Sequence, residues 1–218
     1  MHQKNAISEL KNNVKTTYNK ELHAIRKLEK VNNILRGHIP SMSSMVEDEI
    51  AKFILKVTSQ KWKIYLDSSI SVKTNQNKTK TFRPDMLLLD EKGNVKAIFE
   101  IKTSMGYYRD AIKVIEKLIN MHKAFIKTQY LLCSFSRKGK EKAIKQEVIY
   151  QKDVQRFIIT YSDNACDEKH HTQNKANAKK KGICHFILFN GWYDDNEMRY
   201  DDMSNFIKQL KKLKQPFM

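Results

Sequence analysis

The segment at residues 82–104, FRPDMLLLDEKGNVKAIFEIKTS, sets the strictest limit on the fold, because two apolar runs here flank a short turn rich in charge and glycine. The first run, Met86–Leu89, is apolar at every position and is predicted to be buried on both faces. The second run alternates, so its side chains divide between the two faces of a strand. The segment therefore predicts a β-hairpin inside a domain, not an exposed ribbon.

The flanking sequence predicts helices before and after this hairpin. Apolar residues recur at spacings of three and four over residues 7–35, ahead of Gly37 and Pro40, which is typical of an amphipathic helix. Two helices with a break near Asn12 are an alternative. The same patterns predict further elements: a helix after Ser44, one bent strand over residues 62–72, a helix over 107–125, strands over 130–135, 154–161 and 184–189, a polar loop over 162–182, and a basic helix over 201–214.

The order of these elements predicts an α/β fold with a central mixed β-sheet flanked by helices. The hairpin would supply antiparallel strand pairs, and the crossover through the helix at residues 107–125 would supply a parallel pair. No internal repeat and no interdomain linker is visible. We therefore expect a single domain over residues 1–218.

The charge of the chain indicates its class of partner. The formal net charge is +17 at pH 7, which favours an anionic partner, with nucleic acid ahead of a membrane surface. No apolar run approaches the roughly 18 residues that a membrane-spanning helix needs. The alternative is a basic protein whose lysines only interact with water. The 3 cysteines are too few for a disulfide scaffold and fit a reducing cytoplasm.

Three charged residues lie at the edges of the hydrophobic hairpin. Glu100 and Lys102 are two positions apart, so they project from the same face of one strand, and Asp85 opens the neighbouring strand. After the turn, the two carboxylates would meet, and they would repel unless a cation lay between them. Mg²⁺ prefers such hard oxygen ligands and would act on a phosphodiester. Lys102 would orient a water nucleophile or stabilise charge on phosphorus.

Pro84-Asp85 followed by Glu100-Ile101-Lys102 resembles the signature of the PD-(D/E)xK nucleases, and among them the type II restriction endonucleases. In that family the two motifs lie on adjacent strands of a mixed sheet, and a helix and another strand follow. Residues 44–135 are similar in this order. The resemblance implies a restriction-endonuclease-like core and a Mg²⁺-dependent, sequence-specific endonuclease for double-stranded DNA, which acts as a homodimer on palindromic sites.

The resemblance also implies roles for individual residues. Asp85 and Glu100 would be metal ligands, the carbonyl of Ile101 a third ligand, and Lys102 the catalytic lysine. Many members place a further glutamate on a helix before the first strand. Glu47 and Glu49 both flank the apolar stripe of the second helix, and periodicity does not choose between them; Glu47 is preferred, although it also fits a capping box with Ser44.

The resemblance divides the single domain into three parts: a helical N-terminal segment at residues 1–40, a catalytic core at 44–135, and DNA-recognition and C-terminal elements at 136–218. Two other functions stay open: a repair or junction-resolving nuclease with the same centre, and a non-catalytic basic DNA-binding protein.

Basic residues outside the motif are candidates for contacts with DNA phosphates, because lysine clusters bind phosphates without reading sequence. The candidates are Arg83, Arg137, Lys138, Lys140, Lys142, Lys175, Lys179, Lys180 and Lys181. A zinc site is a weaker alternative, because its residues lack the usual paired spacing. Its candidate ligands are Cys166, His170, His171, Cys184 and His185.

Overall fold

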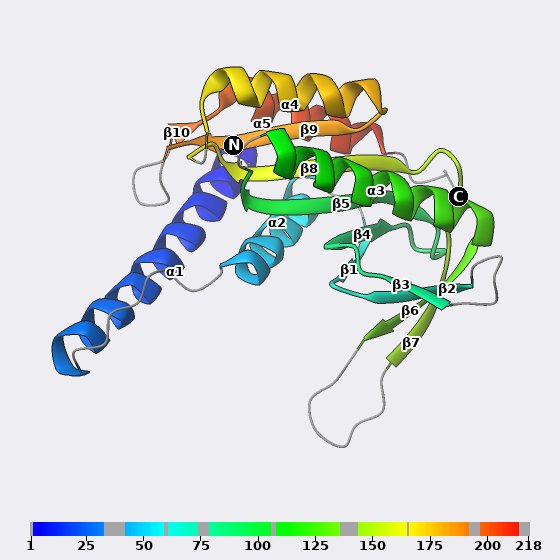
Figure 1. Cartoon of the computed structure of the whole chain (residues 1–218), viewed down its shortest axis with the longest axis horizontal. Coiled ribbons are helices and arrows are strands. Elements are labelled where there is room, and N and C mark those ends of the chain that lie inside the picture. The colour runs from blue at the N-terminus through cyan, green and yellow to red at the C-terminus, as the bar shows by residue number, and fades with distance from the viewer. Residues whose placement is uncertain are drawn as a thin grey trace.

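The computed structural model describes residues 2–32, 42–58, 61–73, 79–105, 108–135, 144–164, 166–191 and 197–213 (Figure 1). The helices within these ranges are α1 (His2–Asn32), α2 (Ser43–Thr58), α3 (Tyr108–Thr128), α4 (Glu168–Lys180) and α5 (Tyr200–Lys212). The strands are β1 (Lys63–Leu66), β2 (Ser69–Lys73), β3 (Thr79–Phe82), β4 (Met86–Leu89), β5 (Val95–Ser104), β6 (Tyr130–Phe135), β7 (Ile144–Ile149), β8 (Gln155–Ser162), β9 (Cys184–Asn190) and β10 (Glu197–Met198).

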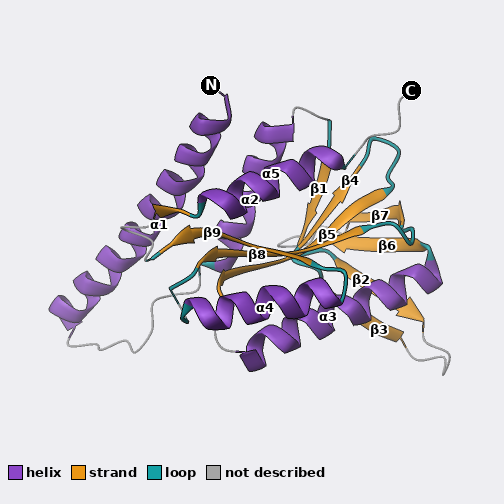
Figure 2. Cartoon of the chain, turned by 90° about the horizontal axis from the view of Figure 1, so that it is seen from above, coloured by secondary structure: helices purple, strands orange, loops and turns teal. Residues whose placement is uncertain are grey.

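A mixed sheet of six strands forms the centre, in the order β1-β4-β5-β8-β9-β10. The pairs β1–β4, β4–β5 and β9–β10 are antiparallel, whereas β5–β8 and β8–β9 are parallel. Helices α3 and α4 cover one face, and α1, α2 and α5 cover the other (Figure 2). The predicted α/β class with a mixed sheet between helices is confirmed.

A second, antiparallel sheet has the order β3-β2-β6-β7. It lies on the α3 side of the central sheet, where its inward side chains share one hydrophobic cluster with α3 and β4. In Figure 1 the hairpin of β6 and β7 extends away from the central sheet. Helix α3 packs against both the central sheet and this smaller sheet.

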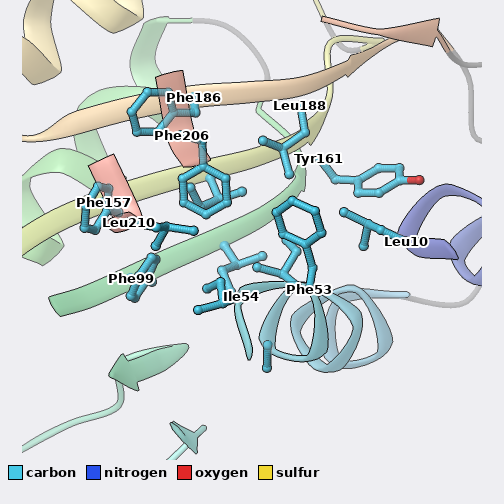
Figure 3. Packing of buried hydrophobic residues seen from close by; sticks show 14 of the residues in the cluster. Leu10, Phe53, Ile54, Phe99, Phe157, Tyr161, Phe186, Leu188, Phe206 and Leu210 are labelled. Atoms are coloured by element: carbon cyan, nitrogen blue, oxygen red, sulfur yellow. The ribbon is translucent and has the colours of Figure 1, made fainter. Parts of the chain in front are cut away.

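The apolar sequence of β4 follows from this layering. Met86 and Leu88 face α1, α2 and α5, whereas Leu87 and Leu89 face α3 and the second sheet, and all four are fully buried. Figure 3 shows the first of these clusters, in which Phe53 of α2 stacks on Phe206 of α5, with ring centroids 6.3 Å apart. A strand between two cores has no polar face, which confirms the prediction for this run.

Three sequence-based expectations are wrong. Residues 62–72 form two strands, because the chain leaves the central sheet at Asp67, where φ is 47°, and enters the second sheet as β2. The parallel neighbour of β5 is β8, and β6, the strand directly after α3, belongs to the second sheet. The polar loop expected over residues 162–182 contains α4, whose N-cap Asp167 accepts a hydrogen bond from the backbone N–H of His170.

The remaining elements agree with the sequence patterns or add to them. Helix α1 is continuous over His2–Asn32, so the alternative break near Asn12 does not occur. The short strands β3 and β7 were not expected from the sequence. Within the described ranges, no helix combines the length and the apolar character that crossing a bilayer requires.

Candidate functional site

The turn between β4 and β5 sets the register of the hairpin that carries the predicted acidic residues. Oδ1 of Asp90 accepts hydrogen bonds from two backbone N–H groups of the turn. Gly93 has a φ of 84°, which glycine adopts at little cost. In the resulting register Met86 of β4 is the cross-strand partner of Phe99 of β5. Asp85, the residue before β4, therefore lies level with the second half of β5.

Asp85 is attached to β5 through its side chain. Its Oδ2 accepts hydrogen bonds from the backbone N–H of Ile101 at 2.7 Å and from Nζ of Lys102 at 3.0 Å. Its backbone carbonyl accepts from the N–H of Asp67, at 3.0 Å, at the end of β1. The two hydrogen bonds to Oδ2 fix the position of the carboxylate relative to the strand that bears the second acid.

Glu100 lies in the interior, with 0% of its side chain exposed. Its Oε2 accepts a hydrogen bond from Nζ of Lys117 at 2.7 Å and lies 3.5 Å from Nζ of Lys102. Its Oε1 is buried and has no hydrogen-bond partner among the described residues. Burial, together with the nearby charge of Asp85, raises the pKa of Glu100 to about 7, although both lysines act in the opposite direction.

Lys102 links the two carboxylates. Its Nζ contacts Asp85 and Glu100 and also donates to the backbone carbonyl of Ile101 at 3.1 Å. Burial alone would lower the pKa of Lys102, but the two adjacent carboxylates outweigh it, so the pKa is raised. The side chain is 32% exposed. Lys102 is therefore a cation at neutral pH, between the interior and the solvent.

Lys117 is a site residue that sequence reasoning missed. It comes from α3, which covers the face of β5 that carries Glu100. Its Nζ lies 2.7 Å from Oε2 of Glu100 and 3.6 Å from Oδ1 of Asp85, and its side chain is 43% exposed. The sequence signal was weak, because α3 also carries Lys113, Lys123 and Lys127 and none is distinguished by spacing.

The two glutamates of α2 lie in different surroundings. Glu47 is half-buried near Asp85 and Lys102; burial raises its pKa, a hydrogen bond from Ser43 at 2.9 Å opposes this, and the charge of Asp85 raises it further. Glu49 lies toward α1, where Asn13 donates to it at 2.6 Å and Lys52 pairs with it at 2.6 Å. The structure thus brings Glu47, and not Glu49, toward Asp85.

The predicted DNA-contact residues that the structure describes are not gathered in one place. Arg83 is exposed next to the site, 3.6 Å from Asp67. Lys175 forms an ion pair within the protein, because its Nζ lies 2.5 Å from Oδ2 of Asp202. The other described candidates, Lys179, Lys180 and Lys181, are exposed at the C-terminal end of α4. The remaining candidates, Arg137, Lys138, Lys140 and Lys142, lie outside the described residues.

The candidate zinc ligands do not converge. His185 is buried and hydrogen-bonds Thr160 at 2.9 Å, and burial lowers its pKa to about 3. Cys166 instead lies 3.6 Å from His171, which also contacts the carbonyl of Asp163. Across the described part of the chain, no group of three or more His, Cys, Asp or Glu side chains is placed to hold a metal ion.

The oxygen atoms near Asp85 and Glu100 suit a smaller ligand set. Two carboxylates and the carbonyl of Ile101 are hard oxygen donors, and Mg²⁺ is usually bound by one or two carboxylates together with water and substrate oxygens. Oε1 of Glu100 is a buried oxygen of this set that lacks a hydrogen bond from the described residues. Such an atom requires an explanation, and a bound cation would supply one.

Comparison of the chain with protein-family models, with curated proteins and with solved structures finds no match. The chemistry of the site is therefore inferred from its own residues and from the motif that they form.

Proposed function

We propose that the protein is a Mg²⁺-dependent endonuclease that hydrolyses phosphodiester bonds in double-stranded DNA, with the core of a type II restriction enzyme. The single observation that carries the proposal is the convergence of Asp85 and Glu100, from adjacent strands, on the ammonium group of Lys102. Glu100 also keeps one buried carboxylate oxygen, Oε1, without a hydrogen-bond partner among the described residues. Surface salt bridges rarely bury a carboxylate completely, because the desolvation cost is high unless the charge has a role or a full set of partners.

Asp85 and Glu100 would hold the cation, and its affinity would depend on pH. Mg²⁺ held there would neutralise charge on the scissile phosphate and acidify a water molecule. Asp85 is oriented by the backbone N–H of Ile101, so its free lone pairs keep one direction. Glu100, with its pKa raised to about 7, loses its proton near neutrality and then offers a full negative charge to the ion.

Lys102 acts as a positive charge. Because its pKa is raised, it stays protonated at neutral pH and does not accept the proton of the attacking water. Its ammonium group is 32% exposed, so it can reach a phosphate oxygen while it keeps contact with Asp85. It would orient the nucleophile and stabilise the charge that develops on phosphorus.

Sequence specificity and a two-fold dimer are part of the proposal. One centre of this kind cuts one strand, so cutting both strands of a palindromic site requires two copies related by two-fold symmetry. The net charge of +17 supports an anionic substrate.

Incubation of supercoiled plasmid DNA with the protein and Mg²⁺ tests this function, with EDTA as the metal-free control. Discrete linear fragments are the expected result. A smear would indicate cutting without sequence preference, and preferential cutting of branched DNA would indicate a repair or junction-resolving nuclease. DNA binding without cutting at any Mg²⁺ concentration would indicate that the protein binds DNA but does not catalyse its cleavage.

A further inference from the structure

A groove with four lysines lies between α3 and the ribbon of β2 and β3, which run alongside each other in Figure 2. Its volume is about 490 Å³, which is in the range of ligand sites. The lysines that line it are Lys73, Lys80, Lys123 and Lys127. No acidic residue is among its described lining residues, and none of the four lysines forms an ion pair within the described part of the chain.

The groove holds one of these cations in place before any ligand arrives. Nζ of Lys80 lies 5.0 Å from the centroid of the Phe82 ring, within reach of a cation–π interaction. Phe82 in turn packs edge-on against Phe125 of α3, with centroids 5.5 Å apart. Lys80 is therefore less free than an ordinary surface lysine, and its charge stays over the floor of the groove.

The groove lies along the same face of α3 as Lys117, which belongs to the candidate active site. Lys117, which contacts Glu100, does not line the groove. It is followed along α3 by Asn120, Ala124 and Lys127, at spacings of three, four and three, and these three residues do line the groove. Residues at these spacings share a helix face. With a rise of about 1.5 Å per residue, Lys127 lies about 15 Å from Lys117 along the helix axis.

We infer that this groove binds the sugar-phosphate backbone of the DNA on one side of the scissile phosphate. The distance of about 15 Å corresponds to roughly four base-pair steps of about 3.4 Å each. Lysines without acidic neighbours attract phosphates and read no sequence, so the groove would position the duplex and would not select it. The identity of the ligand rests on the proposed function, whereas the anionic class rests on the four lysines.

The test compares two double variants with equal loss of charge. Lys123→Gln/Lys127→Gln removes two exposed lysines of α3, and Lys208→Gln/Lys211→Gln removes two exposed lysines of α5, on the opposite face of the central sheet. DNA affinity is measured in EDTA as a function of salt, so that binding is separated from cutting. The α3 variant should lower the slope of log affinity against log salt by about 1 for each lysine, and the α5 control should leave it unchanged.

The outcomes separate this inference from the proposed function. Equal salt slopes for the wild type and the α3 variant would show that the groove does not bind the DNA backbone, even if the wild type cuts DNA in Mg²⁺. A reduced slope together with no cutting supports the groove and overturns the proposed hydrolysis. Absence of any DNA binding by the wild type overturns both. A melting temperature measured for each variant shows that the fold is intact.

Discussion

Glu100 combines complete burial with a pKa raised from 4.5 to about 7. A raised pKa means that the folded state binds the proton more tightly than the unfolded state. The stability from this group is therefore fully present below about pH 4.5 and is lost as pH rises toward 7. At about 1.4 kcal/mol per pH unit, the loss over this interval is on the order of 3 kcal/mol.

Glu100→Gln should remove this part of the pH dependence. The free energy of unfolding, measured by denaturant titration in EDTA between pH 4.5 and 8, should fall with pH in the wild type and stay flatter in the variant. Glu91→Gln, which changes an exposed acid in the turn of the same hairpin, serves as the control and should follow the wild type. A variant curve parallel to the wild-type curve would show that Glu100 is not the group that titrates.

Glu47 lies near Asp85, and Glu49 faces α1, so their amide variants should differ. Glu47→Gln keeps the shape of the side chain and removes its charge, and it should raise the Mg²⁺ concentration needed for cleavage by about 10- to 100-fold, as expected for residues that support metal ligands. Glu49→Gln should change the Mg²⁺ requirement little. A Mg²⁺ titration of the cleavage rate measures both variants. An effect confined to Glu49→Gln would mean that Glu49, and not Glu47, belongs to the site.

At the scale of elements, α3 contributes to the site through Lys117. Above pH 7, removal of its ammonium group leaves the negative charge of Glu100 less compensated. At lower pH Glu100 is protonated and neutral, so the same removal affects stability less. Lys117→Met should therefore lower stability at pH 8 toward the lower end of about 1–3 kcal/mol, because the lysine is partly exposed, and by less at pH 5.

Lys113→Met is the matched control for this prediction. Lys113 lies one turn earlier on α3, is exposed, and is 3.8 Å from Asp110. Denaturant titrations at pH 5 and pH 8 compare the two variants. Equal losses at both values of pH for Lys117→Met would mean that its contact with Glu100 has no electrostatic role.

The elements that sequence alone predicts are those with strong local signals. The hairpin of β4 and β5 is an example, because its apolar runs and its Gly93 turn are local signals, and they bring Asp85 beside Glu100 without distant information. Helix α4 is the opposite case. Its buried face is limited to His171, Asn174 and Ala178, so hydrophobic periodicity is nearly absent and the segment reads as a loop.

Local sequence patterns do not show to which sheet each strand belongs. Apolar residues occupy alternate positions through β1 and β2, and alternation does not reveal that the chain changes sheets at Asp67. For the same reason β6 was expected beside β5, although β8 holds that position. Lys117 was missed because its role depends on how α3 lies over β5, which spacing within α3 does not encode.

At the scale of the whole molecule, the net charge of +17 predicts strongly salt-dependent binding. If about six to ten phosphates are neutralised, DNA affinity should fall by roughly 10³ to 10⁵ between about 50 and 200 mM salt, because bound counterions are released from DNA. Fluorescence anisotropy with a labelled duplex in EDTA measures this fall. Affinity that hardly changes with salt would mean that the positive charge only keeps the protein in solution.

Under the proposed function, Asp85 and Glu100 together hold the metal ion on which DNA cleavage depends. The most direct measurement is the single-turnover rate of plasmid cleavage in Mg²⁺ for the wild type, Asp85→Asn and the surface control Glu91→Gln, with DNA affinity measured for each protein in EDTA. Asp85→Asn should lose cleavage by at least about 100-fold and bind DNA as well as the wild type, whereas Glu91→Gln should be fully active. Cleavage by Asp85→Asn at the wild-type rate would contradict this assignment.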